Sequence, residues 1–229
     1  MGESMIFKNV SSCLKSVVLA VLIIIGGGVQ FGAAKADAEG RAYFAGGCFW
    51  CVESDFERVR GVNEVISGYT GGETQNPSYK AIKSGGTGHF EAVEIHYHLD
   101  QVSYEQLLHA FFRSIDPTDD GGQFCDRGDA YRTAVFVSNG EERKAAERAR
   151  SNAERELGQK IVTPILDAQE FFPAESYHQD FYKQKGIIMT RRGPKSKANA
   201  YKFYRKGCGR DKRVLELWGD KAVFANAKY

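Results

Sequence analysis

The segment AGGCFWCVES, Ala45–Ser54, joins the end of a short apolar stretch to a helical pattern. The residues Arg41–Ala45 predict a β-strand that two glycines terminate, and apolar side chains recur at helical spacing from Phe49 onward. This strand–turn–helix unit places Cys48 at the start of the helix and Cys51 one turn inside it. Helix N-termini stabilise anions, so we expect a lowered pKa for the Cys48 thiol. Cys48 is therefore our candidate nucleophile.

The strands and helices that follow predict the fold class. Strand patterns lie at residues 62–69, 91–97 and 131–138, and a helix capped by Ser103 precedes the last of them. The order strand, helix, strand, strand, helix, strand predicts an α+β fold, a two-layer ferredoxin-like sandwich with a βαββαβ core. The polar segment 73–89 indicates a long loop. The region after Phe171 has little periodicity, so we expect an irregular C-terminal extension.

Composition and charge indicate an ordinary globular protein. The chain has 229 residues, of which 42% are hydrophobic and 26% charged, and this length suits one sizeable domain. The net charge of +2 gives no strong field for an anionic partner. We therefore expect no nucleic-acid partner, and we expect a monomer.

The N-terminal residues have the pattern of a secretory signal. Lys8 and Lys15 precede and flank the apolar run 17–25, and the small-residue motif Ala36-Asp37-Ala38 follows it. This pattern predicts a signal peptide at residues 1–38, cleaved after Ala38, and a catalytic domain at 39–229. An uncleaved membrane anchor is the alternative, because the apolar stretch approaches the length of a membrane span. Either interpretation predicts export, with the periplasm as the expected compartment.

Four cysteines remain in the predicted mature chain, and their spacing leaves several possibilities open. Cys48 and Cys51 form a Cys-x-x-Cys pair, whereas Cys125 and Cys208 stand alone. The pair is compatible with a redox couple, half a zinc site or a structural disulfide. A zinc site needs a second close pair of ligands, so we expect no metal.

A carboxyl group and several tyrosines are candidates for proton transfer and oxygen binding. Glu91 lies at one end of an apolar row on a predicted strand, where partial desolvation raises a carboxyl pKa and favours a general acid. Solvent exposure at a sheet edge is the alternative for Glu91. Tyr79 and Tyr131 follow turn-forming segments, and their hydroxyls can hold a substrate oxygen. His89 is a weaker candidate because it can equally support its loop.

Five successive motifs resemble those of one enzyme family. They are Gly47-Cys-Phe-Trp50, Gly68-Tyr-Thr-Gly-Gly72, Asn76-Pro-Ser-Tyr79, Gly88-His-Phe-Glu91 and Tyr131-Arg132. Their order is similar to that in the peptide methionine sulfoxide reductases of the A type, over residues from about 41 to about 172. Several spaced motifs in one order are a specific signal.

The resemblance implies a reaction and a set of roles. It implies reduction of methionine-S-sulfoxide, free or in proteins, to methionine, with Cys48 attacking the sulfoxide sulfur. It also implies that Glu91 protonates the sulfoxide oxygen and that Tyr79 and Tyr131 hydrogen-bond it. The remaining implied residues are Phe49 and Trp50 as the walls of a methyl pocket, Asp126 as an organiser of polar groups, and His89 as a substrate-binding residue.

The resemblance further implies that a second cysteine resolves the sulfenic acid left on Cys48. Cys208 lies between glycines in a tail expected to be mobile, and it resembles the family's recycling cysteine. Cys51 is a second candidate, although a helical turn is expected to point it away from Cys48. Cys125 is the third, with a small packed residue as its simpler interpretation. No bound cofactor is implied; a thioredoxin-like protein or dithiothreitol supplies the electrons.

The chain departs from the family pattern at two places. Many members have glycine at the position of Cys51, and commonly Asn and Gln at the positions of Cys125 and Ala130. The recycling step is the part that these departures affect. A thiol–disulfide oxidoreductase that uses Cys48 and Cys51 as a pair remains the alternative enzyme. A non-catalytic module that holds an apolar ligand between the aromatic residues is the alternative outside enzymes.

Overall fold

The structure is a computed structural model and describes residues 38–225. All but the last residue of the predicted signal segment, 1–38, lie outside the described residues. Among residues 38–225, no helix combines the length and the apolar character needed to cross a membrane.

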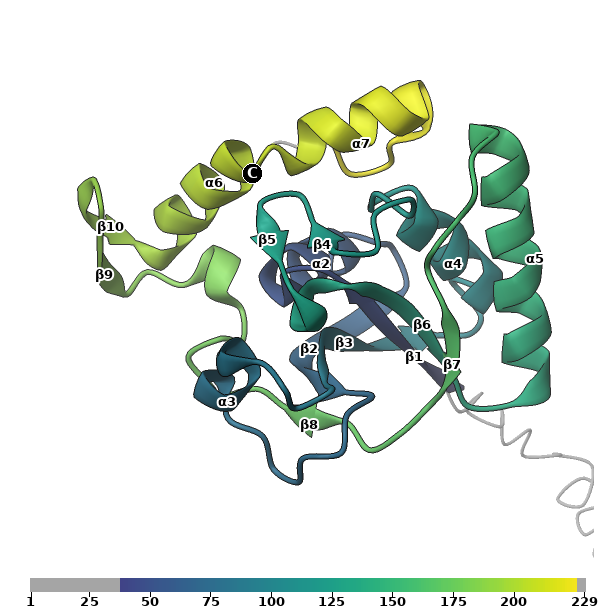
Figure 1. Ribbon diagram of the computed structural model, residues 1–229, viewed down its shortest axis with the longest axis horizontal. Helices are drawn as coiled ribbons and strands as arrows, with labels where there is room; N and C mark the ends of the chain where they lie inside the picture. Colours follow the sequence, from purple (N-terminus) through teal and green to yellow (C-terminus); the bar gives the residue numbers. More distant parts are fainter. Residues whose placement is uncertain (1–37, 226–229) are drawn as a thin grey trace, which may run out of the picture. The chain divides into compact units, whose positions relative to one another are not determined.

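A six-stranded mixed sheet with the order β7-β6-β1-β3-β2-β8 forms the centre of the described chain (Figure 1). Its strands are β1 (Glu39–Gly46), β2 (Val62–Thr70), β3 (Phe90–His98), β6 (Thr133–Val137), β7 (Ile165–Asp167) and β8 (Phe172–Pro173). All neighbours pair antiparallel except β6 and β7, which pair parallel. The strand β1 lies in the interior of the sheet and ends at Gly46. The segment that follows it therefore starts near the middle of the row formed by the strand ends.

Two helices pack on one face of this sheet and enclose the main core. They are α2 (Phe49–Phe56) and α4 (Tyr104–Phe112), and α5 (Gly140–Leu157) packs against α4. Phe44 of β1 stacks on Phe111 of α4 with ring centroids 4.7 Å apart. Ser103 caps α4 as expected, in a capping box with Gln106. The predicted order of strand, helix, strand, strand, helix, strand is therefore present, within a mixed α/β fold.

The predicted loop 73–89 and the segment that precedes β6 both contain short elements. Helix α3 (Tyr79–Ser84) lies in the predicted loop 73–89, because Ser78 accepts a hydrogen bond from the backbone of Ala81 and starts the helix. Farther along the chain, β4 (Gly122–Gln123) and β5 (Asp126–Arg127) form a small hairpin, followed by the 3₁₀ turn η1 (Asp129–Tyr131). Both departures carry residues of the predicted site.

The expectation of an irregular C-terminal extension is wrong. This region forms a hairpin of β9 (Ile187–Thr190) and β10 (Gly193–Ser196), then α6 (Lys197–Cys208) and α7 (Arg210–Trp218), with the 3₁₀ turns η2 (Phe181–Lys183) and η3 (Gly219–Lys221). Figure 1 shows α6 and α7 lying across the β4–β5 hairpin and α2.

Buried charge, which hydrophobic periodicity does not detect, holds these two helices in place. Arg205 and Arg210 are each 2% exposed, and Arg205 Nη1 lies 2.9 Å from Asp55 Oδ1 on α2. Arg210 donates hydrogen bonds to the carbonyl groups of Gly46 and Ser114, both at 3.0 Å.

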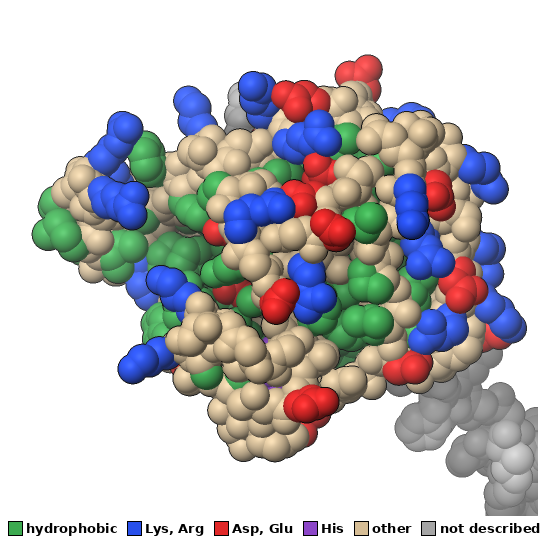
Figure 2. Space-filling model, in the orientation of Figure 1, with side chains coloured by type: hydrophobic (Ala, Val, Ile, Leu, Met, Phe, Trp, Pro, Cys, Tyr) green, Lys and Arg blue, Asp and Glu red, His purple; other side chains and the backbone are tan. Residues whose placement is uncertain are grey.

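Positive and negative side chains are interspersed on the face drawn in Figure 2, and hydrophobic ones gather over the β9–β10 hairpin.

Candidate active site

Cys48 is the N-cap residue of α2 and follows the two glycines that end β1. Gly47 has φ +83°, and a Cβ there would lie 2.5 Å from Cβ of Gln123. A side chain at this position would meet both backbone strain and a packed neighbour. The turn therefore requires glycine, and it delivers Cys48 from the central strand to the start of the helix.

Cys48 opens into a cavity of about 80 Å³ that brings together side chains from distant parts of the chain. The lining residues are Cys48, Phe49, Trp50, Tyr79, Glu91, Asp126, Tyr131 and Tyr204. Seven of these eight were predicted from the sequence; Tyr204 was not. The volume suits a small group of atoms rather than a whole ligand. A much larger hollow of about 690 Å³, lined by Glu53, Glu57 and their neighbours, contains none of the predicted catalytic residues.

Glu91 is the buried acid of this cavity. It is 2% exposed, and its Oε2 atom accepts the backbone N–H of Phe49 at 3.1 Å. Burial raises the pKa of Glu91 to about 8, and the charges of Asp126 and Cys51 add to the shift. The hydrogen bonds from Phe49 and Tyr131 oppose it. The carboxyl group is therefore protonated at neutral pH, as a general acid requires, and not exposed at a sheet edge.

The two tyrosines meet across the cavity from Glu91. Tyr131 ends η1 and hydrogen-bonds Glu91, and Tyr79 hydrogen-bonds Tyr131. Burial raises the pKa of Tyr79 to about 12 and that of Tyr131 further, so both hydroxyls keep their protons. Glu175 holds Tyr79 in place, since its carboxylate accepts the backbone N–H of Tyr79 at 2.9 Å and the hydroxyl of Tyr69 at 3.1 Å. The site thus contains three adjacent O–H donors.

An aromatic wall forms the apolar side of the cavity. The Trp50 ring stacks on Phe181 with centroids 3.8 Å apart and an interplanar angle of 6°. Its indole N–H donates to Nδ1 of His178 at 3.1 Å. His178 is 2% exposed, and burial lowers its pKa to about 4, so the ring is neutral and Nδ1 is free to accept. Sequence patterns do not single out His178, because its contact with Trp50 spans 128 residues.

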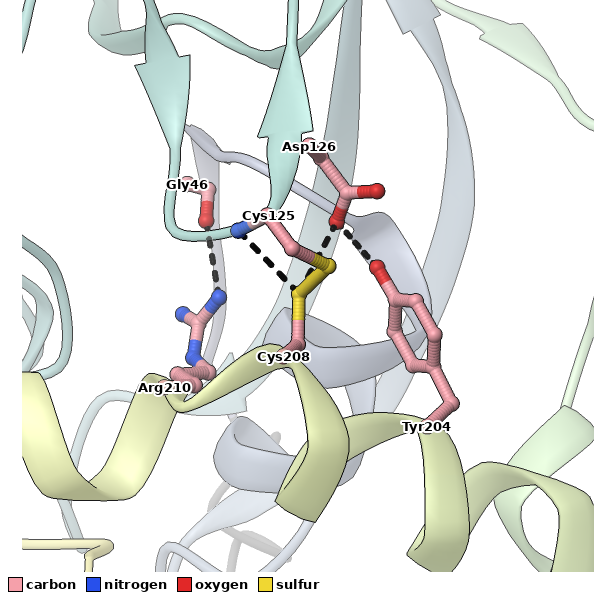
Figure 3. The surroundings of a disulfide bond; sticks show 6 residues. All are labelled: Gly46, Cys125, Asp126, Tyr204, Cys208 and Arg210. Atoms are coloured by element: carbon pink, nitrogen blue, oxygen red, sulfur yellow. Dashed lines mark hydrogen bonds between the residues drawn. A yellow bond between two sulfur atoms is a disulfide. The ribbon is translucent and has the colours of Figure 1, made fainter.

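Asp126 lies between the cavity and a disulfide bond. Cys125 and Cys208 are bonded across 83 residues, with a Cα–Cα distance of 5.0 Å. Asp126 Oδ2 accepts the hydroxyl of Tyr204 and lies 3.8 Å from Cys208 Sγ, as Figure 3 shows. The interpretation of Cys125 as a small packed residue is therefore wrong. Tyr204 and Cys208 are four residues apart, which is about one turn of a helix. A predicted helix over this segment would therefore have placed both side chains on one face.

Two expectations about the Cys-x-x-Cys pair are also wrong. Cys48 and Cys51 are both free and buried, and their thiols hydrogen-bond each other instead of pointing apart. The N-cap and N3 side chains of a helix face each other, as in a capping box, which explains the contact. Burial, the hydrogen bond to Cys51 and the carboxylates of Glu91 and Asp126 raise the pKa of the Cys48 thiol rather than lowering it.

The charge of the C-terminal helices acts on Cys51 in the opposite direction. The pKa of the Cys51 thiol is lowered by its hydrogen bond with Cys48 and, against the effect of burial, by the guanidinium groups of Arg210 and Arg205.

His89 does not line the cavity. It is 1% exposed, its Nδ1 accepts the backbone N–H of Gly72 at 3.2 Å, and its Nε2 lies 2.7 Å from the carbonyl oxygen of Thr74. Because Nδ1 accepts, the ring proton is on Nε2 and is donated to Thr74. These contacts support the 72–89 segment, so the placement gives His89 a structural role rather than substrate contact.

Comparisons with known proteins find relatives of one family. The family model described as peptide methionine sulfoxide reductase matches residues 40–208. The chain is 49% identical over 189 residues to the peptide methionine sulfoxide reductase MsrA 2 of Rhizobium meliloti, covering 82% of this chain and 88% of that one. It is 46% identical over 182 residues to MsrA of Bacillus subtilis, covering 79% and 96%.

Two solved structures have similar folds. Methionine sulfoxide reductase A of Corynebacterium diphtheriae gives a TM-score of 0.58 at 32% identity, covering 62% of this chain and 73% of that one. The reduced form of Mxr1 from Saccharomyces cerevisiae gives a TM-score of 0.59 at 28% identity, covering 62% and 82%.

Proposed function

Because the chain belongs to the peptide methionine sulfoxide reductase family, it is an oxidoreductase that converts methionine sulfoxide to methionine, and we propose that Cys48 performs the attack. The observation that carries the assignment is the cavity itself. A buried thiol, a protonated carboxyl, two tyrosine hydroxyls and an aromatic wall converge on one small space. These groups match the sulfur, the oxygen and the methyl group of a bound sulfoxide.

The first half-reaction moves one oxygen atom from methionine sulfoxide to Cys48. Glu91 gives its proton to the sulfoxide oxygen, because a protonated oxygen leaves sulfur more readily. The Cys48 sulfur attacks the sulfoxide sulfur and loses its proton, which restores the Glu91 carboxyl. The protonated oxygen then passes from the methionine sulfur to the Cys48 sulfur as the new sulfur–sulfur bond breaks, methionine departs, and Cys48 is left as a sulfenic acid. The sum is sulfoxide plus thiol giving thioether plus sulfenic acid, so atoms and protons balance.

The other lining residues position the substrate. Tyr79 and Tyr131 donate hydrogen bonds to the sulfoxide oxygen, and Phe49 and Trp50 enclose the methyl group. Asp126 organises the polar groups on the side toward Tyr204. Such a fixed arrangement of oxygen donors and methyl wall distinguishes the two epimers at sulfur, and we assign the S epimer as substrate.

The assignment is tested by incubating the protein with a methionine-S-sulfoxide peptide and dithiothreitol and measuring methionine by chromatography. We expect methionine from the S epimer and none from the R epimer. Cys48→Ser should abolish the product. Equal turnover of both epimers would contradict the assigned stereochemistry, and an active Cys48→Ser protein would contradict the assigned nucleophile.

A thiol–disulfide oxidoreductase that uses Cys48 and Cys51 directly is the second candidate, and their contact favours it. Burial opposes it, because the two residues are only 7% and 2% exposed and a protein disulfide cannot reach either sulfur. Cys51→Ala separates the two functions. It leaves the first sulfoxide turnover intact under our proposal and removes all activity under the alternative.

Three further assignments belong to the same proposal. We infer that a thioredoxin-like dithiol protein supplies the electrons and that oxidised proteins are the substrates. The signal-like residues 1–38 support export to the periplasm, which N-terminal sequencing of the protein from cell fractions tests. The strand order β6-β1-β3-β2 with α2 and α4 on one face supports a ferredoxin-like core within the mixed sheet.

A further inference from the structure

The charge of the C-terminal region is concentrated in one segment. Residues 181–210 contain ten Lys and Arg side chains and no Asp or Glu, although the whole chain has a net charge of only +2. Three of the ten, Lys183, Arg205 and Arg210, form ion pairs with carboxylates of other segments. The other seven form no ion pair with any of residues 38–225. The segment therefore presents an excess of positive charge that the described part of the protein leaves unpaired.

Strand β9 in this segment has one face on the active site and one in solvent. Ile188 packs against the cluster of side chains that includes the nucleophile. Ile187 and Met189 alternate with it and are 70% and 78% exposed. Lys185 and Arg191 flank the strand at the same alternation and are also exposed. These four exposed side chains, Lys185, Ile187, Met189 and Arg191, form what we call the outer row.

The mixture of apolar and basic side chains continues from the outer row onto α6. The guanidinium carbon of Arg192, in the hairpin turn, lies 4.7 Å from the ring centroid of Phe203, which is 45% exposed. Figure 1 shows the β9–β10 hairpin projecting beside α6, and Figure 2 shows hydrophobic and Lys or Arg side chains together over it. The outer row, Arg192 and Phe203 thus make one exposed surface, which we call the hairpin surface.

Lys197 carries the positive charge from the hairpin surface to the aromatic wall of the cavity. Its Nζ atom lies 5.4 Å from the ring centroid of Phe181, the ring that stacks on Trp50. The ammonium group donates to the carbonyl oxygen of Tyr177 at 3.1 Å and to Oε1 of Gln184 at 2.7 Å. In the described part of the chain it has no carboxylate partner. A half-buried cation therefore stands beside the methyl pocket.

The size of the cavity places most of a substrate outside it. A space of about 80 Å³ holds the sulfoxide group and the methyl group of one side chain. When that side chain belongs to a polypeptide, the residues on either side of it lie on the surface around the cavity. The hairpin surface adjoins the cavity through Ile188 and Phe181, which pack in the same cluster as Cys48.

We propose that the hairpin surface binds the polypeptide around the oxidised methionine and selects substrates with acidic and apolar residues beside it. The inference rests on the proposed function of the Cys48 cavity and names the class of polypeptide that it accepts. Unpaired cations attract carboxylates, and complementary charge favours both encounter and correct register. Exposed Ile187 and Met189 supply the apolar contact.

Continuity with the cavity favours a polypeptide over an anionic lipid surface as the occupant. A bilayer would touch only the residues that protrude, such as those of the outer row. The unpaired charge extends beyond them to Lys197, which is half-buried and lies over Phe181. A flexible acidic chain can follow this path to the cavity, whereas a flat lipid surface cannot.

The proposal is tested by steady-state kinetics of the full chain with three peptides of equal length. Each peptide contains one methionine-S-sulfoxide with leucine on both sides, followed by aspartate, glutamine or lysine. Free methionine-S-sulfoxide is the reference for each protein. At low ionic strength kcat/KM should be roughly 3- to 10-fold higher for the aspartate peptide than for the lysine peptide, the usual range for a few exposed charge pairs. Added salt should reduce this ratio by screening.

Two double variants with the same change of charge separate the hairpin surface from the net charge of the protein. Lys185→Glu with Arg191→Glu should bring the ratio of the aspartate to the lysine peptide to about one or below, because it reverses two cations of the outer row. Arg60→Glu with Lys160→Glu is the control and should keep the ratio. Both of these residues are exposed, and they follow α2 and α5, away from β9 in the chain.

A third double variant tests the apolar contact. Ile187→Thr with Met189→Thr should lower kcat/KM for all three peptides relative to free methionine-S-sulfoxide and leave their order unchanged. Values equal to those of the parent protein would overturn the apolar part of the proposal.

Three results would overturn the proposal as a whole. They are equal kcat/KM for the aspartate and lysine peptides, an unchanged ratio in the outer-row variant, and the same loss of the ratio in the control. Equal peptide kinetics together with cosedimentation of the protein with phosphatidylglycerol vesicles would assign the surface to a membrane instead. Failure to reduce free methionine-S-sulfoxide would overturn the proposed function itself, so the two failures are distinguishable.

Discussion

The backbone N–H of Phe49 donates a 3.1 Å hydrogen bond to Oε2 of Glu91, 42 residues farther along the chain. This contact ties the acid on β3 to the first turn of α2, one residue after the nucleophile. Because both groups are held by backbone elements of the sheet-and-helix core, their relative position does not depend on a loop. The acid and the thiol are preorganised in the free protein.

Glu91→Gln should slow the chemical step by roughly 10²- to 10⁴-fold, the usual contribution of a general acid. Glutamine fills the same space and can still accept the Phe49 N–H, but it has no acidic proton. The measurement is methionine formation in a single turnover. Glu94→Gln is the control, because Glu94 lies on the same strand as Glu91 but on its opposite face. The rate of methionine formation by this variant should equal that of the wild type.

Glu91 should also make the stability of the protein depend on pH. Its folded-state pKa of about 8 lies above the ordinary carboxyl value, so near neutral pH the folded state binds one more proton than the unfolded state. Stability from this group is therefore complete at low pH and is lost as the pH rises toward 8. The expected loss is about 1.4 kcal/mol per pH unit while Glu91 stays protonated.

Urea unfolding of the wild type and Glu91→Gln at pH 6.5 and pH 8 measures this effect. The wild type should lose more stability over the interval than the variant. Glu53, whose pKa burial raises to about 7, and His178, whose pKa burial lowers to about 4, also change stability with pH, but they do so in both proteins and cancel in the comparison. If the two proteins lose the same stability between pH 6.5 and pH 8, Glu91 is not the group whose loss of a proton destabilises the wild type.

His178→Phe should weaken substrate binding more than it slows chemistry. The phenyl ring keeps the packing but leaves the Trp50 indole N–H without its acceptor. An indole N–H without an acceptor that weakens substrate binding by about 1–2 kcal/mol raises KM roughly 5- to 30-fold. Steady-state kinetics measure the split between KM and kcat. Tyr177→Phe is the control, since the Tyr177 ring packs at a tilt against the same His178 ring but is 48% exposed.

Arg205→Met should destabilise the protein by about 3–5 kcal/mol, the usual effect of removing one partner from a buried ion pair. The substitution leaves the Asp55 carboxylate with less compensation beneath α6. Chemical denaturation measures the change. Lys212→Met on α7 is the control, because its side chain is 84% exposed. Adding Asp55→Asn to Arg205→Met should recover part of the loss, and strictly additive effects would argue against the pair.

Local patterns in the sequence were sufficient for the central elements and for the nucleophile. The glycine pair before Cys48, the helical spacing from Phe49 and the alternation around Glu91 are all short-range, and each lies where it was expected. The C-terminal helices bury only Tyr201, Val214 and Trp218 among their apolar residues, and two buried arginines supply the rest of the attachment, so the search for an apolar stripe missed them. Hydrophobic periodicity carries no signal for such a contact.

The sequence by itself determined the strand–turn–helix unit, the order of the core elements and the family to which the chain belongs. Only the tertiary structure decided how the cysteines pair, that Cys48 and Cys51 are in contact, and that Tyr204 and His178 join the site. It also decided that burial raises the pKa of Cys48. The reason is physical: capping, turns and periodicity act over a few residues, whereas desolvation and sulfur–sulfur contact depend on segments brought together by folding.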